Sequence, residues 1–449
     1  MSIDSIISLT ITRETQTPSR AGFGTPMILA WGPSGAPMNA TYEAAADMLT
    51  DGWASTDPAY LAVLSAFAQN PRPTQVKVIK KTSARSVQTI EVRPRPVSEL
   101  VVGDVYSVDI GGQTAEYELD TGDTIDDVVT GLTAAIDALT VAVDATADLT
   151  DDVIDCVGTG SPTAFLAYEN PVNVYLYDRT AASGTEATDI SNAENLDSDW
   201  YFLLTPQDHS KALITAWAAQ AETRRILYIA MTGDYDVPES IGGSVTSDTV
   251  STLVASAYER TDPFWHHEIA AGQEGARCGY VAPTDPGSIT WEFKTMAGVP
   301  VTAKLHVAGE TGFTEMKAKG ANYYREIKGL ELTLGGSQAA SGEYLDVMRG
   351  SDWLHARIQE NVLALLANAD KVPFTDAGVD QVRSEILAVL RQGIRQGFLA
   401  EDPPPTVTAP AVADVSASDK ANRTLPDVEF EATLAGAVHS TTIAGRLVL

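Results

Sequence analysis

Two polar runs hold side chains suited to metal binding or catalysis. His266–Glu268 offers the nitrogen and oxygen atoms of a metal site, and Asp208–Ser210 offers the three residue types of a nucleophilic triad. Neighbouring residues on a strand point to opposite faces, however, and a triad needs side chains that converge from separate elements. We therefore predict no metal site at the first run, and at the second we predict helix capping rather than catalysis.

Other candidate sites are acidic or rich in glycine. Five aspartates between residues 144 and 155 offer ligands for a hard cation, but their spacing lacks the alternating pattern and central glycine of a calcium loop. The run that begins at Gly158 lacks the third glycine of a dinucleotide-binding loop. No phosphate-loop, nucleophile-elbow, zincin or Cys-x-x-Cys motif occurs. The sequence thus predicts a protein that is not an enzyme, without cofactor or metal, and an exposed acidic surface at the aspartates.

The chain contains two cysteines, Cys156 and Cys278, which are too few for a disulfide scaffold. Two buried free thiols are expected of a protein kept in a reducing cytosol. The alternative is a disulfide between subunits that forms after release into an oxidising medium.

Length and charge exclude several classes of protein. The 449 residues carry a formal net charge of −30, which disfavours binding to nucleic acid or to anionic lipid. No apolar run approaches the roughly 20 residues that a membrane-spanning helix needs, and the first 30 residues lack the pattern of a secretion signal. We therefore expect a protein made and kept in a cytosol.

The negative charge is concentrated in one stretch. Residues 97–199 contain 22 acidic residues and a single basic residue, Arg179. Alternating strands at 105–110 and 114–119 flank a Gly-Gly turn, which predicts a β-hairpin. A capping threonine at 124 and apolar residues at helical spacing predict a helix that follows it. These features predict an inserted, outward-facing acidic α+β domain over residues 97–196.

The segments on either side of the insert predict an α/β core domain, made of residues 26–96 and 197–335. Apolar strands alternate with helices in the order typical of a largely parallel sheet. The predicted strands are 75–79, 199–204 and 225–231, and the predicted helices are 211–222 and 248–259.

Two amphipathic helices are predicted at 343–369 and 375–398, within a C-terminal helical domain over residues 336–400. The second helix carries three arginines, Arg383, Arg391 and Arg395. A solvated polar face is the simplest explanation for them, although a basic strip is unusual in so acidic a protein.

Both ends of the chain have the pattern of strands on tethers. An alternating stretch at 7–12 lies in an N-terminal arm and linker over residues 1–25, and residues 401–449 combine a proline-rich linker with a second alternating stretch. Such strands either fold back on their own subunit or add to a neighbouring subunit by main-chain hydrogen bonds. The predicted arm residues are Ile7, Leu9, Ile11, Val428, Phe430, Leu434, Leu447 and Leu449.

The sequence resembles the contractile tail sheath proteins of myophages, in the branch long known only as a domain of unknown function. The resemblance covers most of the chain and is weakest in the acidic insert. The segments that carry it are Ile6–Thr12, Gly22–Leu29 with Trp31 and Gly32, Asp199–Leu204 with the helix after it, Arg225–Ile229, and the C-terminal helices up to Gly397–Ala400.

The resemblance implies a structural subunit of a phage particle, assembled in the host cytoplasm. Sheath subunits stack as hexameric rings in a helix around a tail tube, between a baseplate and a tail terminator, and exchange terminal strands. Contraction then drives the tube through the host envelope. The resemblance further implies that the insert lies outermost and that Arg383, Arg391 and Arg395 face the tube. Another self-assembling surface-array protein and an α/β enzyme are the alternatives.

Overall fold

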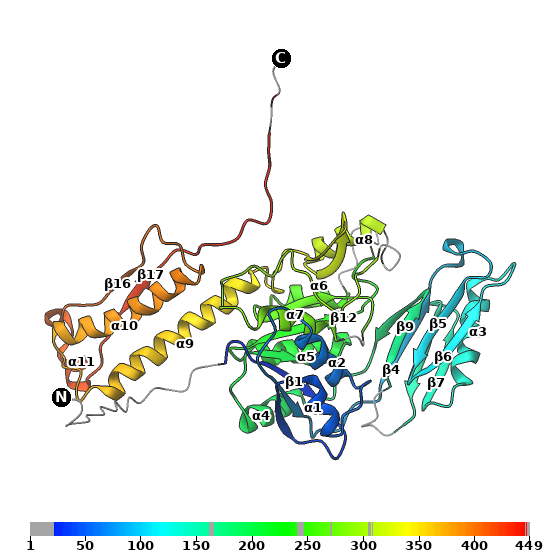
Figure 1. The fold of residues 1–449 in the computed structure, drawn as a ribbon, viewed down its shortest axis with the longest axis horizontal. Helices are drawn as coiled ribbons and strands as arrows, with labels where there is room; N and C mark the ends of the chain where they lie inside the picture. Colours follow the sequence, from blue (N-terminus) through cyan, green and yellow to red (C-terminus); the bar gives the residue numbers. More distant parts are fainter. Residues whose placement is uncertain are drawn as a thin grey trace, which may run out of the picture. The chain divides into compact units, whose positions relative to one another are not determined.

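The computed structural model describes residues 22–160, 166–239, 247–269, 272–303, 307, 309–444 and 446. These residues form two compact units (Figure 1). The first, here called the α/β unit, comprises Gly22–Arg349 and the residues from Ala437 onward, and the second, the C-terminal unit, comprises Gly350–Gly436. None of the described helices is long and apolar enough to cross a lipid bilayer.

The α/β unit is built on an eight-stranded sheet. The strand order is β15 (Leu330–Leu334), β14 (Asn322–Ile327), β13 (Thr261–Trp265), β12 (Leu227–Thr232), β11 (Phe202–Leu204), β1 (Pro26–Ala30), β3 (Val76–Lys80) and β2 (Asn39–Tyr42). All neighbouring pairs from β14 to β3 are parallel, and only the edge strands β15 and β2 run antiparallel to their neighbours. The predicted α/β class is thereby confirmed.

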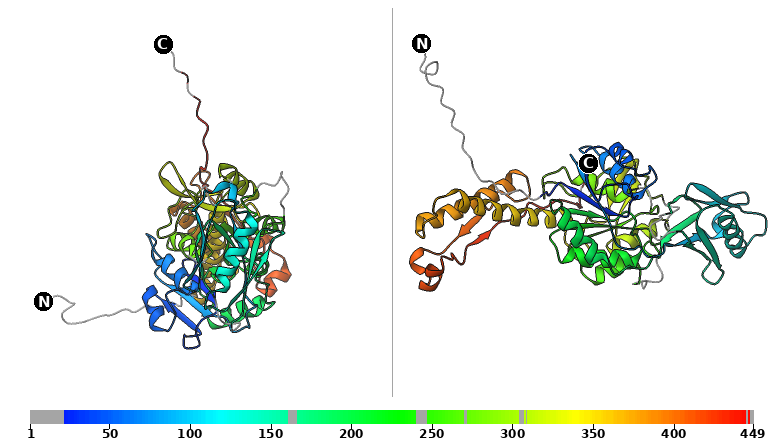
Figure 2. Two further views of the ribbon diagram at one scale, coloured as in Figure 1. Left: turned by 90° about the vertical axis from the view of Figure 1, so that its right-hand side faces the viewer. Right: turned by 90° about the horizontal axis from the view of Figure 1, so that it is seen from below.

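Helices cover both faces of this sheet (Figure 2). Helices α4 (Glu186–Leu196), α5 (Lys211–Glu222) and α6 (Thr249–Ala255) share one apolar cluster with β1, β11 and β12. Helices α2 (Pro58–Phe67) and α7 (Gln273–Val281) contact the same strands. Alternate residues of β12 belong to the two different apolar clusters, which places the two helix groups on opposite faces. The unit also contains α1 (Ala45–Thr50) and α8 (Gly309–Lys319).

Glycines allow α2 and α7 to approach closely. A β carbon on Gly275 would lie 2.0 Å from the carbonyl oxygen of Ala62, and one on Gly279 would lie 2.5 Å from that of Ala66. Any larger residue at these positions would therefore push the two helices apart.

The acidic insert forms two antiparallel sheets joined by one helix. Its elements are β4 (Thr89–Pro94), β5 (Val105–Ile110), β6 (Gln113–Glu118), α3 (Ile125–Asp137), β7 (Val143–Asp148), β8 (Val153–Gly158), β9 (Tyr168–Val172) and β10 (Val174–Asp178). A short 3₁₀ turn at Val97–Glu99 lies between β4 and β5. One sheet has the order β10-β4-β8-β7 and the other β6-β5-β9. The predicted hairpin is β5–β6, and Thr124 and Asp127 cap α3 reciprocally as expected.

The domain boundaries differ from those predicted. The insert begins at Thr89 rather than at residue 97, because β4 pairs with β8 and β10. It ends near Asp178, because α4 buries Ile190 and Ala193 in the core of the α/β unit. Residues 336–349 also belong to that unit, where Ala340 packs against the same core.

The C-terminal unit contains α9 (Leu345–Asn368, from Gly350 onward), α10 (Asp376–Arg395), β16 (Thr406–Thr408), a 3₁₀ turn at Val412–Asp414, α11 (Ala417–Asn422) and β17 (Glu429–Glu431). Both long helices are confirmed, and Thr375 caps the second. Residues 401–426 are not an extended linker, because they include β16, the 3₁₀ turn and α11.

Candidate assembly surfaces

The last strand among the described residues pairs within its own subunit. β17 runs antiparallel to β16 with Phe430 opposite Val407, and Leu434 forms a bridge with Leu399. In the single chain Phe430 and Leu434 thus pair within their own subunit, and the proline-rich segment before them supplies the partner strand. The assignment of Val428, Phe430 and Leu434 to an arm that adds to a neighbouring subunit stays a prediction.

The β16–β17 ladder remains a candidate site for strand addition. All three residues of β17 are exposed, and Phe430 and Leu434 keep 48% and 45% of their surface open to solvent. A two-stranded ladder is only marginally stable in water, and its open edge presents unpaired main-chain groups. An added strand would cover these groups and the exposed phenylalanine.

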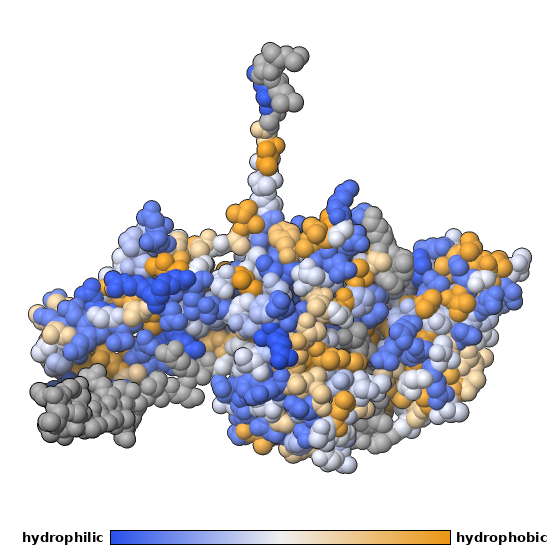
Figure 3. All heavy atoms as spheres, viewed as in Figure 1, coloured by the Kyte–Doolittle hydropathy of each residue, from blue (hydrophilic) through white to orange (hydrophobic). Residues whose placement is uncertain are grey.

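The three arginines of α10 have two different environments. Arg383 donates from Nε and Nη2 to the carbonyl oxygen of Val407 on β16, at 3.2 and 3.1 Å, and pairs with Asp380 at 2.8 Å. Arg391 and Arg395 are exposed, and neither forms an ion pair with any residue that the structure describes. Arg383 therefore ties β16 to α10, whereas the other two remain available to a partner. Figure 3 shows largely hydrophilic residues over this unit on the face in view.

Helix α9 exposes leucines near its end. Leu363 and Leu366 are 56% and 55% exposed, whereas Trp353 is 2% exposed and lies against Gly393 of α10. Exposed apolar side chains on one helix mark a candidate contact with another molecule.

The remaining arm residues fall at the ends of the chain. The predicted arm residues Ile7, Leu9, Ile11, Leu447 and Leu449 lie outside the residues that the structure describes. Residues 435–449 are here called the C-terminal arm. Its described residues, 435–444 and 446, form no helix or strand, and Val438 and Ile443 are 84% and 86% exposed. An extended segment with open main-chain groups and exposed apolar side chains is suited to β-strand addition.

Known proteins are similar to this chain first over α9 and α10 and then over its whole length. Residues 345–402, which span α9 and α10, match the family model of the E217 tail sheath protein gp31-like C-terminal domain. Three solved structures share the fold. A chain of the contracted helical sheath of the anti-feeding prophage (AFP) aligns with a TM-score of 0.51 and 14% identity, over 100% of this chain and 99% of that one. The chain has the fold of a contractile sheath subunit.

Two further structures share the fold. A chain of the AFP baseplate, symmetrised sixfold, aligns with a TM-score of 0.51 and 13% identity over 99% of both chains. A chain of the contracted PVC sheath complex of an extracellular contractile injection system aligns with a TM-score of 0.51 and 9% identity, over 98% of this chain and 96% of that one. No curated protein matches the sequence.

In this sheath fold the Asp208–Ser210 run serves the structure. Lys81 pairs with Asp208, and both side chains are fully buried, so burial lowers the pKa of Lys81. The Ser210 hydroxyl donates to the carbonyl oxygen of Thr180 at 2.6 Å and accepts from the N–H of Leu213, which begins α5. The capping prediction is confirmed, and the three side chains do not form a relay.

The His266–Glu268 run is also held by structural contacts. His266 is fully buried, its Nε2 donates to the carbonyl oxygen of Pro300 at 2.8 Å, and its Nδ1 accepts from the N–H of Glu268 at 3.1 Å. Burial lowers the pKa of His266 to about 4. No group of three or more His, Cys, Asp or Glu able to hold a metal ion occurs among the described residues.

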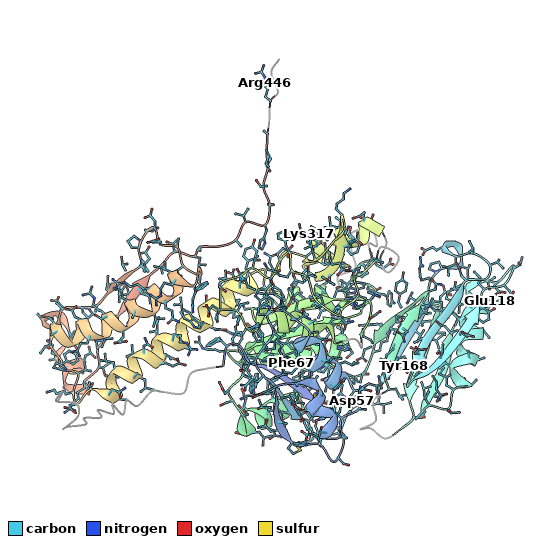
Figure 4. The ribbon with its side chains drawn as sticks, in the orientation of Figure 1. Asp57, Phe67, Glu118, Tyr168, Lys317 and Arg446 are labelled. Atoms are coloured by element: carbon cyan, nitrogen blue, oxygen red, sulfur yellow. The ribbon has the colours of Figure 1, made fainter. Side chains whose placement is uncertain are left out.

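Both cysteines are free and buried. Cys156 lies on β8 of the insert beside Tyr168, which Figure 4 labels, and burial raises the pKa of its thiol to about 12. Cys278 lies on α7, and burial raises the pKa of its thiol above the ordinary range. A disulfide between subunits does not fit this burial, because neither sulfur is accessible to a second chain.

The buried Glu91 of the acidic insert is paired with the arginines Arg93 and Arg179. Glu91 on β4 is 1% exposed, and burial raises the pKa of its carboxyl. Arg179, just after β10, pairs with it. The aspartates between residues 144 and 155 lie on or between β7 and β8, where Asp144 and Asp151 are exposed. The charge of the insert is thus largely a surface property.

Proposed function

We propose that this protein is the sheath subunit of a bacteriophage contractile tail. One observation carries the proposal: a tail sheath family model matches the C-terminal unit of a chain whose whole length aligns with a sheath subunit. The subunits polymerise around a tail tube, and contraction of the polymer drives the tube through the host envelope. The sheath is assembled in the host cytoplasm and becomes part of the virion.

The polymer is built from hexameric rings stacked in a helix, with a baseplate at one end and a terminator at the other. Neighbouring subunits are joined by strand exchange, in which terminal arms add to the β16–β17 ladder of another subunit. The half-exposed Phe430 and the open main-chain groups of this ladder support its role as the acceptor. The alternating Ile7, Leu9 and Ile11 support the role of the N-terminal segment as a donor.

Contact with the tube involves Arg391 and Arg395 of α10. Both are exposed and lie four residues apart on one helix, so they form a small basic strip. Exposed ion pairs are individually weak, which suits a contact that must break during contraction. Arg383 is assigned to holding β16 rather than to the tube, because its guanidinium is already bound to Val407.

A variant of the N-terminal arm tests strand exchange. Replacing Ile7, Leu9 and Ile11 by aspartate should leave a folded monomer that no longer sediments as a polymer. The matched control replaces Ser8 and Thr10 on the alternate face by alanine and should still polymerise. Strand exchange through this arm is refuted if the aspartate variant forms polymers at the wild-type concentration. Loss of the fold in the aspartate variant would assign the arm to its own core.

A second candidate is the sheath of a tail-like injection device without a genome. The alignment of the whole chain with AFP and PVC sheath subunits favours it. Particles purified from the producing cell distinguish the two functions, since a phage sheath copurifies with a DNA-filled capsid. Intact contractile particles that never carry a capsid would favour the injection device.

A further inference from the structure

One residue of the C-terminal arm is held by the α/β unit. Residues 435–444 are all exposed except His439. Its Nε2 lies 2.8 Å from Oγ1 of Thr290. Its ring meets those of Tyr344 and Phe293 edge-on, with centroids 5.3 and 6.0 Å apart and interplanar angles of 86° and 85°. The arm thus has a single docked side chain among solvated neighbours.

The site that receives His439 is held by backbone contacts that do not involve the arm. Phe293 has a φ of +62°, a conformation that a bulky residue rarely adopts. The chain around it is fixed to β15, because the N–H of Phe293 donates to the carbonyl oxygen of Thr333 and the N–H of Thr333 donates to that of Lys294, both at 2.8 Å. The Phe293 ring is nevertheless 43% exposed. The backbone conformation at Phe293 thus keeps its ring out of the apolar core, and the ring forms one wall of a notch.

The polar side of the notch is the Thr290 hydroxyl. Its oxygen accepts from the N–H of Glu292 at 3.2 Å and lies 2.8 Å from Nε2 of His439, so it hydrogen-bonds to both. The His439 side chain thus hydrogen-bonds to the Thr290 hydroxyl and contacts the rings of Tyr344 and Phe293.

We propose that Thr290, Phe293 and Tyr344, here called the His439 notch, anchor the C-terminal arm and set where it leaves the subunit. The role in assembly rests on the proposed function, in which this arm adds to a neighbouring subunit. Docking does not hide the rest of the arm, because Ile443 remains 86% exposed four residues further on. Ile443 can lie no more than roughly 14 Å along the chain from the anchor. The notch therefore confines the arm to a small region, which lowers the conformational entropy that the arm loses when it pairs with a neighbouring subunit.

Distance measurements on the monomer test the docking. Spin labels are placed at Ile443→Cys and Leu330→Cys, two exposed sites of the same unit, while the buried Cys156 and Cys278 stay unlabelled. Electron–electron double resonance should give a narrow distance distribution in the otherwise native chain. Adding either His439→Ala or Thr290→Val should broaden this distance distribution, because loss of one hydrogen bond lowers the equilibrium constant for docking of the arm by about tenfold.

A matched control and a second measurement complete the test. Val438→Ala changes the solvated neighbour of His439 and should leave the distribution narrow. Docking is overturned if the native distribution is already broad or if His439→Ala leaves it narrow. In the sedimentation assay, His439→Ala should raise the threshold concentration for polymerisation about tenfold, through the same loss of docking. A broadened distribution with an unchanged threshold would overturn the positioning role alone. If neither the native chain nor any variant forms polymers, the proposed function is refuted, whereas the docking result is unaffected.

Discussion

Replacing Arg349 by methionine should destabilise the α/β unit by about 3 kcal/mol. Arg349 ends the long segment Gly22–Arg349 of that unit and is 1% exposed. Its guanidinium donates to the carbonyl oxygens of Phe23, Val281, Ala282 and Thr284, at 2.8–3.0 Å, and to the Thr284 hydroxyl at 3.1 Å. One side chain thus joins the entry to β1, the end of α7 and the first turn of α9.

The expected magnitude is the difference between two opposing contributions. The four N–H bonds of Nη1 and Nη2, shared among five oxygens, contribute about 6 kcal/mol at about 1.5 kcal/mol each. The opposing contribution is the desolvation of the buried guanidinium, whose partners are uncharged carbonyl and hydroxyl oxygens. This desolvation lowers the pKa of Arg349 from 12.5 to about 10. That change corresponds to about 3 kcal/mol of desolvation cost. Methionine fills a similar volume but removes both contributions, so about 3 kcal/mol should be lost.

Urea unfolding followed by tryptophan fluorescence measures this loss. Six of the seven tryptophans of the chain lie between residues 22 and 349, so the signal reports on the α/β unit. The control Arg391→Met removes an exposed arginine of α10 and should change the free energy of unfolding by less than about 0.5 kcal/mol. A loss below about 1 kcal/mol in Arg349→Met would refute the reasoning that these hydrogen bonds outweigh the desolvation.

Three further predictions concern buried groups. Because burial lowers the pKa of His266 to about 4 from 6.5, unfolding takes up a proton below about pH 6.5, and the free energy of unfolding should fall by about 3 kcal/mol by pH 4. The His266→Gln variant should lack this fall in a pH series of urea titrations, and an unchanged slope would contradict the assignment. Gly275→Val should cost about 3 kcal/mol or prevent folding, whereas Gly35→Ala, with no atom within 4 Å of the added carbon, should be close to neutral in thermal unfolding. Cys156 and Cys278 should react with a thiol reagent only after denaturation, and rapid labelling of the native chain would show that a sulfur is accessible.

Local patterns in the sequence predicted the elements that depend on local interactions. The hairpin of β5 and β6 follows from strand alternation around Gly111 and Gly112, both of which have positive φ. The start of α10 follows from the capping residue Thr375. Turn and cap geometry is set by residues next to each other, so the sequence contains the information directly.

Elements that depend on distant partners were placed wrongly or missed. The acidic residues of α4 predict that it belongs to the acidic insert, but its packing partners Ile214 and Trp217 come later in the chain. The three residues of β16 lie among prolines and show no period, so the sequence predicts a linker there, and only the pairing with β17 makes them a strand. The roles of Arg349 and His439 were equally hidden, since their partners are backbone carbonyls and a notch nearly 150 residues away.

Electron microscopy of the purified protein, mixed with the tail tube protein of the same particle, shows directly whether it is a sheath subunit. Striated hollow cylinders are expected, and their reconstruction should show a strand of a neighbouring subunit added to the β16–β17 ladder. Monodisperse monomers in the presence of tube, or cylinders whose ladder keeps only its own two strands, would contradict this expectation.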